Sequence, residues 1–333
     1  MTLMTFTEAL WSATVDEMRR DQRILVMGQD IELEAINAVQ ELSQGRIRNT
    51  PISEAAFIGA GIGAALTGMR PVVVLGCSTF LYSAMDQVVN QAAKIRYMFG
   101  GQGSVPLVVR ATVLYSTSSA AHHSDRPWGL FAQAPGLKII VPTTPYDAKG
   151  LLTSAIRDEN PVLCFEDVNL FGIREEIPER EYTVPIGVAA VRRTGSDVTI
   201  VAIAAAVHHG LTAAAELERS GISAEVIDLR TVVPLDRATV LESVTKTGRL
   251  IVVDPAPAMC GVAAEIVATV TEKAFPRLKA PPVRLSAPDI PIPFSPWLER
   301  MIYPTPDAIR SAVRSMLGRA ESSSSARIGL LSA

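Results

Sequence analysis

The chain has 333 residues, 48% of them hydrophobic and 20% charged, which is typical of a soluble globular protein with room for two domains. Its formal net charge of −3 gives no electrostatic case for nucleic acid or an anionic membrane as a partner, and no apolar segment is long enough to span a bilayer. Three separated cysteines indicate reduced, buried thiols in a cytoplasmic protein, without a disulfide framework or a zinc site.

Short apolar strands alternate with Ala-rich helices along the chain. Near-continuous apolar strands between amphipathic helices indicate an α/β protein whose parallel sheets are covered on both faces. We predict strands at residues 23–27, 72–75, 106–110, 138–141, 162–166, 198–203, 224–228 and 250–253. We predict helices at residues 54–67, 82–97, 145–157, 206–220 and 261–275.

Residues 175–197 break this alternation and are rich in Glu, Arg, Pro and Gly. We interpret this stretch as the crossing between two domains, residues 1–185 and residues 186–318. The tail, residues 319–333, contains a run of serines and is predicted to be disordered.

The segment from Gly59 to Ala64 fits GxGxxA, a pattern found in dinucleotide-binding turns. That function needs a strand directly before the pattern and an acid at the end of the next strand, and neither is present. We therefore predict that the small residues allow close helix packing, including packing against another subunit. Met85, Met98 and Phe99 fit the apolar face of a helix and are predicted to lie in the core.

Two polar residues are candidate catalytic groups. Glu54 falls in the first turn of a helix that Ser53 or Thr50 can cap. The positive end of the helix dipole favours a carboxylate at that position, so Glu54 can be explained without a catalytic role. His123 follows a predicted parallel strand, where α/β proteins place chemistry, although a surface histidine pair with His122 fits equally well. The residues by themselves thus indicate a candidate Glu and His site and do not reach a reaction.

Residues 48–74 read RNTPISEAAFIGAGIGAALTGMRPVVV, which resembles the β subunit of the decarboxylating component of pyruvate and branched-chain 2-oxoacid dehydrogenases. Further stretches agree in order: AMDQVVNQAAKIRYMFGG at 84–101, HSD at 123–125, SGISAEVIDLRTVVPLD at 220–236 and KTGRLIVVD at 246–254. The resemblance covers roughly residues 5–316. It implies a transketolase-like pyrimidine-binding thiamin-diphosphate fold, followed by a domain of the transketolase C-terminal type.

The resemblance implies thiamin diphosphate as the cofactor and assigns site residues. The family's glutamate falls on Glu54, whose carboxyl group would hydrogen-bond N1′ of the aminopyrimidine and favour the imino tautomer that creates the ylid. The aromatic residue that stacks on the pyrimidine falls on Phe80, and Gly76 lies in the wall near the cofactor. The family's active-site histidine falls on His123, which would orient and exchange protons with the bound intermediate or the lipoyl acceptor.

The resemblance also implies ions and partners. A monovalent-cation site of some relatives, with K⁺ as the expected ion, maps to Leu107, Ala155, Ile156, Asp158 and Asn160, and a loop that needs only hydrogen bonds is the alternative. The chain contains no GDG motif, which in this family binds the diphosphate through Mg²⁺ and belongs to the α subunit. An α2β2 heterotetramer is therefore implied, with a lipoyl acyltransferase or acyl-carrier protein as acceptor.

The chain departs from the family in the cofactor wall, which reads VVLGCS, and in the loop at 112–121, which lacks the usual glycines. Such contacts set specificity, so the substrate stays open. The main prediction is a subunit, active only with an α subunit, that decarboxylates a 2-oxoacid and passes the acyl unit to a lipoyl or other carrier. The alternatives are half of a split transketolase-like enzyme that transfers a two-carbon ketol unit to a carrier, and a noncatalytic scaffold subunit.

Overall fold

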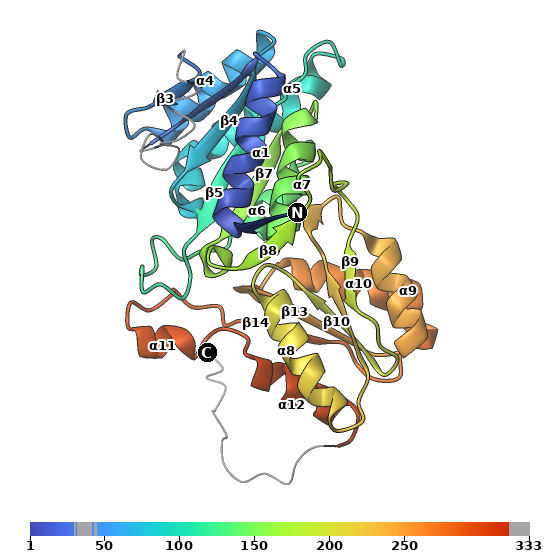
Figure 1. The fold of residues 1–333 in the computed structure, drawn as a ribbon. Coiled ribbons are helices and arrows are strands. Elements are labelled where there is room, and N and C mark those ends of the chain that lie inside the picture. Colours follow the sequence, from blue (N-terminus) through green and yellow to red (C-terminus); the bar gives the residue numbers. More distant parts are fainter. Residues whose placement is uncertain (30, 32–41, 43–44, 320–333) are drawn as a thin grey trace.

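Two large sheets, one in each half of the chain, organise the structure (Figure 1). The computed structural model describes residues 1–29, 31, 42 and 45–319. The strands are β1 (Thr2–Thr5), β2 (Ile24–Gly28), β3 (Ile47–Asn49), β4 (Arg70–Leu75), β5 (Val108–Val113), β6 (Lys138–Ile140), β7 (Val162–Asp167), β8 (Arg174–Ile177), β9 (Ala190–Arg193), β10 (Val198–Ala202), β11 (Ala224–Asp228), β12 (Thr231–Val233), β13 (Leu250–Pro257) and β14 (Val283–Ala287). The α-helices are α1 (Phe6–Arg20), α4 (Glu54–Leu66), α5 (Ala93–Met98), α6 (Trp128–Ala132), α7 (Pro145–Arg157), α8 (Ala206–Glu218), α9 (Arg237–Thr247), α10 (Val262–Ala274), α11 (Pro296–Arg300) and α12 (Pro306–Met316).

Both sheets are parallel in their interiors, as predicted. The first has the strand order β12-β6-β7-β5-β4-β2-β3, and the second has the order β14-β13-β10-β11-β9. Among the strands that the structure describes, one edge strand of each sheet runs antiparallel, β12 against β6 and β9 against β11. A small additional ribbon joins β1 and β8. The two-domain α/β architecture is therefore confirmed.

The covering helix α7 shows how the sequence builds a layer over the first sheet. Its cap residue Thr144 accepts a hydrogen bond from the Asp147 amide at 3.1 Å, and Pro145 occupies the first turn, where its missing N–H is tolerated. The neighbouring helix α1, which is absent from the predicted elements, begins with a capping box between Thr5 and Glu8. The two helices pack side by side on the same face of the sheet (Figure 1).

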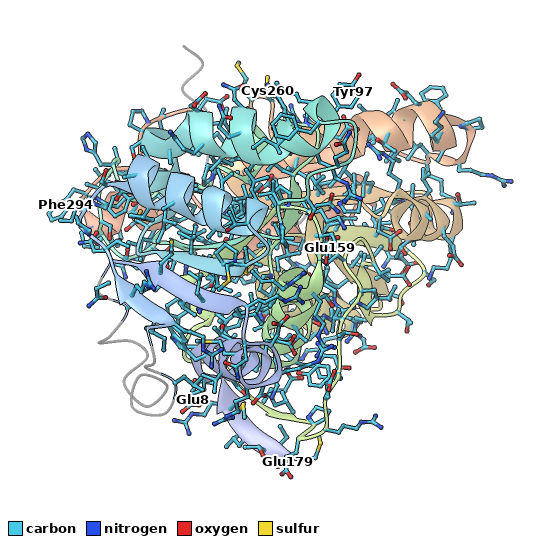
Figure 2. The ribbon with its side chains drawn as sticks, turned by 90° about the horizontal axis from the view of Figure 1, so that it is seen from above. Glu8, Tyr97, Glu159, Glu179, Cys260 and Phe294 are labelled. Carbon is cyan, nitrogen blue, oxygen red and sulfur yellow. The ribbon has the colours of Figure 1, made fainter. Side chains whose placement is uncertain are left out.

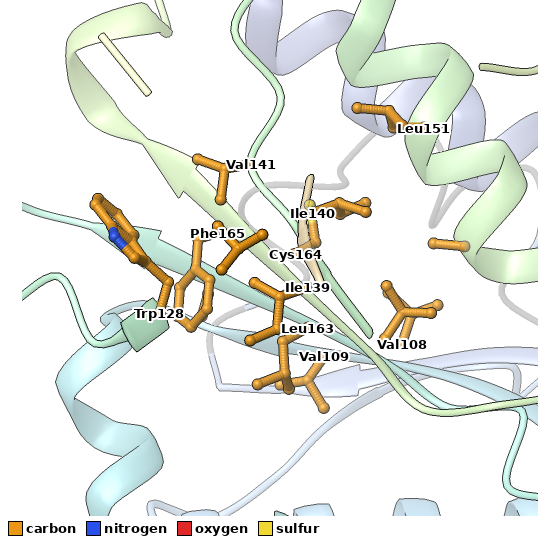
Figure 3. Packing of buried hydrophobic residues seen from close by; sticks show 14 of the residues in the cluster. Val108, Val109, Trp128, Ile139, Ile140, Val141, Leu151, Leu163, Cys164 and Phe165 are labelled. Carbon is orange, nitrogen blue, oxygen red and sulfur yellow. The ribbon is translucent and has the colours of Figure 1, made fainter. Parts of the chain in front are cut away.

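The core of the first half lies in the strands β5, β6 and β7 and the helices that cover them (Figure 3). Phe165 of β7 meets Trp128 of α6 edge to face, with ring centroids 6.1 Å apart, and both side chains are fully buried. Every residue of β4 and β7 is buried, because helices cover both faces of a parallel sheet. This explains the continuous apolar runs in the sequence.

Three local predictions are wrong. Residues 82–97 do not form one α-helix: a 3₁₀ segment η1 (Ser78–Ala84) and a π-helical segment η2 (Asp86–Ala92) precede the short helix α5. Met98 and Phe99 are 69% and 54% exposed, and they lie at the C-terminal end of α5. Cys77 and Cys164 are buried free thiols, but Cys260 is exposed, because it lies in the loop before α10.

The predicted crossing at 175–197 contains strands β8 and β9. One strand from the second half of the chain, β12, pairs with β6 at the edge of the first sheet. An ion-pair cluster also joins the halves, since Arg192 of β9 pairs with the buried carboxylates of Asp147 and Asp228. The boundary at 185 stays a prediction. Residues 320–333 of the predicted disordered tail lie outside the described residues. Within the described ranges, no helix has the length and apolar character needed to cross a membrane.

Candidate active site

The candidate site lies at the carboxyl edge of the first sheet, where the segments that follow three strands meet. β3 leads to Glu54 at the start of α4, β4 leads to Gly76 and Phe80, and β5 leads to the loop that holds His123. β2 runs parallel to both β3 and β4, and β4 runs parallel to β5, so all these strands end at one edge. Ligands of open α/β sheets bind at this edge.

A continuous set of contacts joins the three residues to which the family resemblance assigned roles. The Ser83 hydroxyl oxygen lies 3.3 Å from Oε2 of Glu54 and 2.8 Å from the Phe80 carbonyl oxygen, so it can donate to either. The Phe80 ring meets the His123 ring nearly edge on, with centroids 5.6 Å apart and planes at 75°. The structure thus brings Glu54, Phe80 and His123 together, although up to 69 positions separate them along the chain.

Short side chains at the end of β4 hold the histidine loop in place. The Cys77 thiol donates to the His123 carbonyl oxygen at 3.2 Å, and the Thr79 hydroxyl donates to the His122 carbonyl oxygen at 2.6 Å. Burial raises the pKa of the Cys77 thiol, which therefore stays protonated and able to donate. The sequence analysis missed these residues, because such donors give no distinctive local signal.

Two further contacts complete the attachment of this loop. The Ser78 hydroxyl donates to the Asp125 carbonyl oxygen at 3.0 Å, and the Tyr82 hydroxyl donates to Oδ2 of Asp125 at 3.0 Å. Burial raises the pKa of Tyr82, and the negative charge of Asp125 adds to the effect, so the phenol stays a donor. Ser78 to Tyr82 therefore set the position of the backbone on both sides of His123.

The surface around Glu54 suits the pyrimidine half of thiamin diphosphate. A Cβ atom added to Gly76 would meet no described atom within 4 Å, and Glu54 and Phe80 are both partly exposed. A carboxylate acceptor, an aromatic face and an open wall are the groups that an aminopyrimidine ring needs. No three His, Cys, Asp or Glu side chains gather into a metal site within the ranges that the structure describes.

The start of α4 differs from the prediction in one respect. Ser53 is the N-cap residue, but within the described chain its side chain makes no capping hydrogen bond, and the buried hydroxyl of Thr50 has no partner there. The GxGxxA glycines have a packing role inside this chain: a Cβ on Gly61 would lie 3.0 Å from Cγ2 of Val73. Gly63 faces outward, where a Cβ would meet no described atom within 4 Å. Its packing against another subunit stays a prediction.

The residues predicted to bind a monovalent cation do cluster, but cationic side chains already contact their oxygens. Nε of Arg70 donates to the Ile156 carbonyl oxygen at 3.0 Å, and Nη2 of Arg70 donates to the Asp158 carbonyl oxygen at 2.8 Å. Lys138 pairs with the carboxylate of Asp158. Burial alone would raise the pKa of Asp158, but Lys138 and Asn160 outweigh burial and hold that pKa below its usual value.

The other oxygens of this cluster also accept hydrogen bonds. The carbonyl oxygen of Leu107 accepts from the Val162 amide at 2.9 Å, and that of Ala155 accepts from the Asp158 amide at 3.2 Å. Oδ1 of Asn160 accepts from Arg96 at 2.7 Å. Hydrogen bonds alone therefore account for this arrangement, and the potassium site stays a prediction.

Comparison with known proteins identifies a domain family in each half of the chain. The pyrimidine-binding domain of transketolase matches residues 3–172, and the C-terminal domain of transketolase matches residues 187–309. The chain is similar to the acetoin:2,6-dichlorophenolindophenol oxidoreductase subunit beta of Cupriavidus necator, with 45% identity over 321 residues that cover 92% of this chain and 95% of that protein. It is also similar to the pyruvate dehydrogenase E1 component subunit beta of Bacillus subtilis, with 43% identity over 302 residues that cover 89% of this chain and 93% of that protein.

Among solved structures, a split gene transketolase, described as an inactive beta4 tetramer, shares the fold with a TM-score of 0.78 at 22% identity, covering 96% of this chain and 99% of that one. That likeness concerns the fold alone. The two transketolase domains in tandem, together with relatives that align along nearly their whole length, show that the chain belongs to the family of β subunits of the thiamin-diphosphate-dependent 2-oxoacid dehydrogenases.

Proposed function

We propose that this chain is the β subunit of a heteromeric enzyme that decarboxylates a 2-oxoacid with thiamin diphosphate and passes the acyl unit to a lipoyl group or another carrier. The observation that carries the proposal is the contact path from Glu54 through Ser83 and Phe80 to His123. Family membership supports it, since the relatives include a pyruvate dehydrogenase subunit. We place the enzyme in the cytoplasm.

Each residue of the path has a distinct role in the proposal. Thiamin diphosphate, when bound, supplies the carbon nucleophile for the substrate carbonyl. The Glu54 carboxyl group holds the aminopyrimidine by a hydrogen bond at N1′, and the Phe80 ring packs against the pyrimidine face. His123, half-buried at the edge of Phe80, orients the substrate and holds or delivers a proton at a ring nitrogen.

The proposal includes an α subunit that holds Mg²⁺ and the diphosphate in an α2β2 assembly, with K⁺ as a further ion at the Leu107 to Asn160 cluster. Exposed apolar residues at the end of α5 support a partner: Tyr97 is 90% exposed (Figure 2), and Met98 and Phe99 adjoin it. Contiguous apolar surface of this kind marks protein interfaces. A lipoyl acyltransferase or acyl-carrier protein is the proposed acceptor.

Acetoin is a second candidate substrate. The subunit from Cupriavidus necator is named for acetoin and is 45% identical to this chain. The open wall at Gly76 is compatible with a small, uncharged substrate. Cleavage of acetoin beside its ketone carbon releases acetaldehyde in place of carbon dioxide. The reaction product therefore separates the two candidates.

The test uses the chain copurified with its GDG-bearing partner, with thiamin diphosphate and magnesium. Carbon dioxide release is measured from a panel of 2-oxoacids, and aldehyde release from acetoin and from xylulose 5-phosphate. Carbon dioxide from one oxoacid supports the proposal and identifies the substrate. Aldehyde from acetoin alone supports the second candidate, and aldehyde from the ketose alone supports two-carbon ketol transfer. No product from any substrate would favour a noncatalytic scaffold.

A further inference from the structure

We infer that Glu299, which belongs to the second domain, is a positioning residue that sets the conformation of the loop carrying His123. The inference deepens the proposed function and rests on it. The loop, residues 114–126, follows β5 and extends from the first domain toward α11 (Figure 1). Glu299 lies on α11, and only 1% of its surface is exposed. A buried carboxylate needs strong partners, and the loop supplies them.

Both oxygens of Glu299 bind the loop backbone. Oε1 accepts from the Ser116 amide at 2.6 Å, and Oε2 accepts from the Ser118 amide at 2.8 Å. Hydrogen bonds from amides to an ionised carboxylate are shorter and stronger than those between neutral groups. The contact spans 183 positions of sequence and joins the two domains at the loop that holds a catalytic candidate.

The loop has an unusual backbone at the point of contact. Ser116, Ser118 and Ala120 have φ angles of 61°, 57° and 60°, in the left-handed region that residues with a Cβ atom disfavour. Left-handed residues that alternate with others turn neighbouring amides toward one point and create a concave anion site. The Glu299 carboxylate occupies that site. Since such a backbone persists only where its surroundings over-determine it, the carboxylate is a restraint on the loop.

A second contact fixes the two ends of the same loop. Nη1 of the buried Arg126 donates to the Tyr303 hydroxyl at 2.8 Å. The guanidinium carbon of Arg126 lies 4.6 Å from the centre of the Tyr303 ring and 5.1 Å from that of the Tyr115 ring. Tyr115 lies near the start of the loop and Arg126 ends it, so Glu299 and Tyr303 together contact both ends of the loop and residues 116–118.

The consequence concerns the position of His123. From the first domain, Cys77 and Thr79 hold the carbonyl groups of His122 and His123. From the second domain, Glu299 holds the backbone of residues 116–118, which precede His122 and His123 in the same loop. Without Glu299, the first set of contacts remains while the preceding backbone is free to leave its left-handed conformation. We expect His123 then to lose its fixed orientation against Phe80.

The test compares Glu299→Ala and Glu299→Gln in the copurified complex, with Glu272→Gln, an exposed acid on α10, as the control. Gln keeps the volume but presents an N–H group where one of the two amides needs an acceptor. We expect kcat to fall about 10- to 100-fold for Ala, the scale of a catalytic group displaced by about 1 Å, with a smaller change in KM. The kcat of Glu299→Gln should lie between those of Glu299→Ala and wild type, and the Glu272→Gln control should keep the wild-type kcat.

Two measurements separate positioning from general destabilisation. Combined with His123→Ala, the Glu299→Ala change should reduce kcat little further, because both act through one group. Amide hydrogen exchange at residues 114–121 should accelerate in Glu299→Ala, while the core strands β4 and β7 keep wild-type rates. Additive losses of kcat, or unchanged exchange in the loop, would overturn the inference. An inactive wild-type complex would instead refute the proposed function, and the exchange experiment would still decide whether Glu299 restrains the loop.

Discussion

Replacing Asp254 by Asn should remove the pH dependence that this one buried carboxyl group gives to the stability of the fold. Asp254 lies in β13 with no exposed surface, and its Oδ1 accepts from Nε1 of Trp128 at 3.2 Å and from the Ala256 amide at 3.0 Å. Within the described part of the chain, Oδ2 has no hydrogen-bond partner. Burial raises the pKa of Asp254 to about 6, although the Ala256 amide and the charge of Arg126 oppose the rise.

The sign of the effect follows from proton binding. Because the pKa of Asp254 is about 6 in the folded chain and 3.8 in the reference state, the folded state binds the proton more tightly. The free energy of unfolding therefore falls as pH rises from about 4 to about 6 and is level above that. At about 1.4 kcal/mol for each tenfold change in proton affinity, the difference between these two pKa values amounts to about 3 kcal/mol. Asn, which resembles the neutral carboxyl group, removes this dependence.

The assay is denaturant unfolding of wild type and Asp254→Asn between pH 4.5 and pH 7.5, with Asp307→Asn on the exposed end of α12 as the control. Between those limits, the stability of the variant relative to wild type should increase by about 2 kcal/mol, and the control should show no such trend. A difference that does not change with pH, or one that favours wild type as pH rises, would refute the reasoning. The comparison cancels the other carboxyl groups, which titrate equally in both proteins.

Three further outcomes follow from contacts in the first domain. Glu54→Ala should lower turnover by at least about 100-fold while the α partner still copurifies, and unchanged turnover would end the catalytic assignment. In denaturant unfolding, Gly61→Ala should destabilise the chain by about 1–3 kcal/mol, since the new Cβ would lie 3.0 Å from Cγ2 of Val73. Gly63→Ala, where the new Cβ would meet no described atom within 4 Å, should stabilise α4 by up to about 1 kcal/mol. Equal effects of the two substitutions would contradict this packing. Tyr97→Asp should reduce copurification of the partner without lowering thermal stability, and an undiminished yield would exclude the α5 surface as the interface.

Much of the architecture could be predicted from local sequence patterns. The helix predicted at 145–157 and the strand predicted at 224–228 have the same bounds in the structure. Both depend on short-range chemistry: Thr144 and Pro145 begin the helix, and an apolar run between turn residues forms the strand. The family motif around Glu54 could also be recognised from the sequence alone, because its residues are contiguous along the chain.

Other features depended on contacts that local patterns do not encode. The spacing of apolar residues fits one regular helix with a buried face, whereas in the structure residues 78–92 form 3₁₀ and π segments and Met98 and Phe99 are exposed. The cationic environment of Asp158, which follows α7, likewise comes from Arg70 of β4 and Lys138 of β6. Periodicity describes which residues share a face, but only packing decides what covers that face.

The sequence by itself determined the α/β class, the central strands of both sheets and the helices α4, α7, α8 and α10, and its family motifs led to the prediction that Glu54, Phe80 and His123 are site residues. Only the tertiary structure decided that Ser83 links Glu54 to Phe80 and that the Phe80 ring meets His123. It also decided that Glu299 of the second domain holds the loop before His123. The physical reason is distance along the chain. A helix or strand is specified by neighbours a few residues apart, whereas the carboxylate that stabilises a left-handed loop here lies 183 positions away and becomes its partner only when the domains pack.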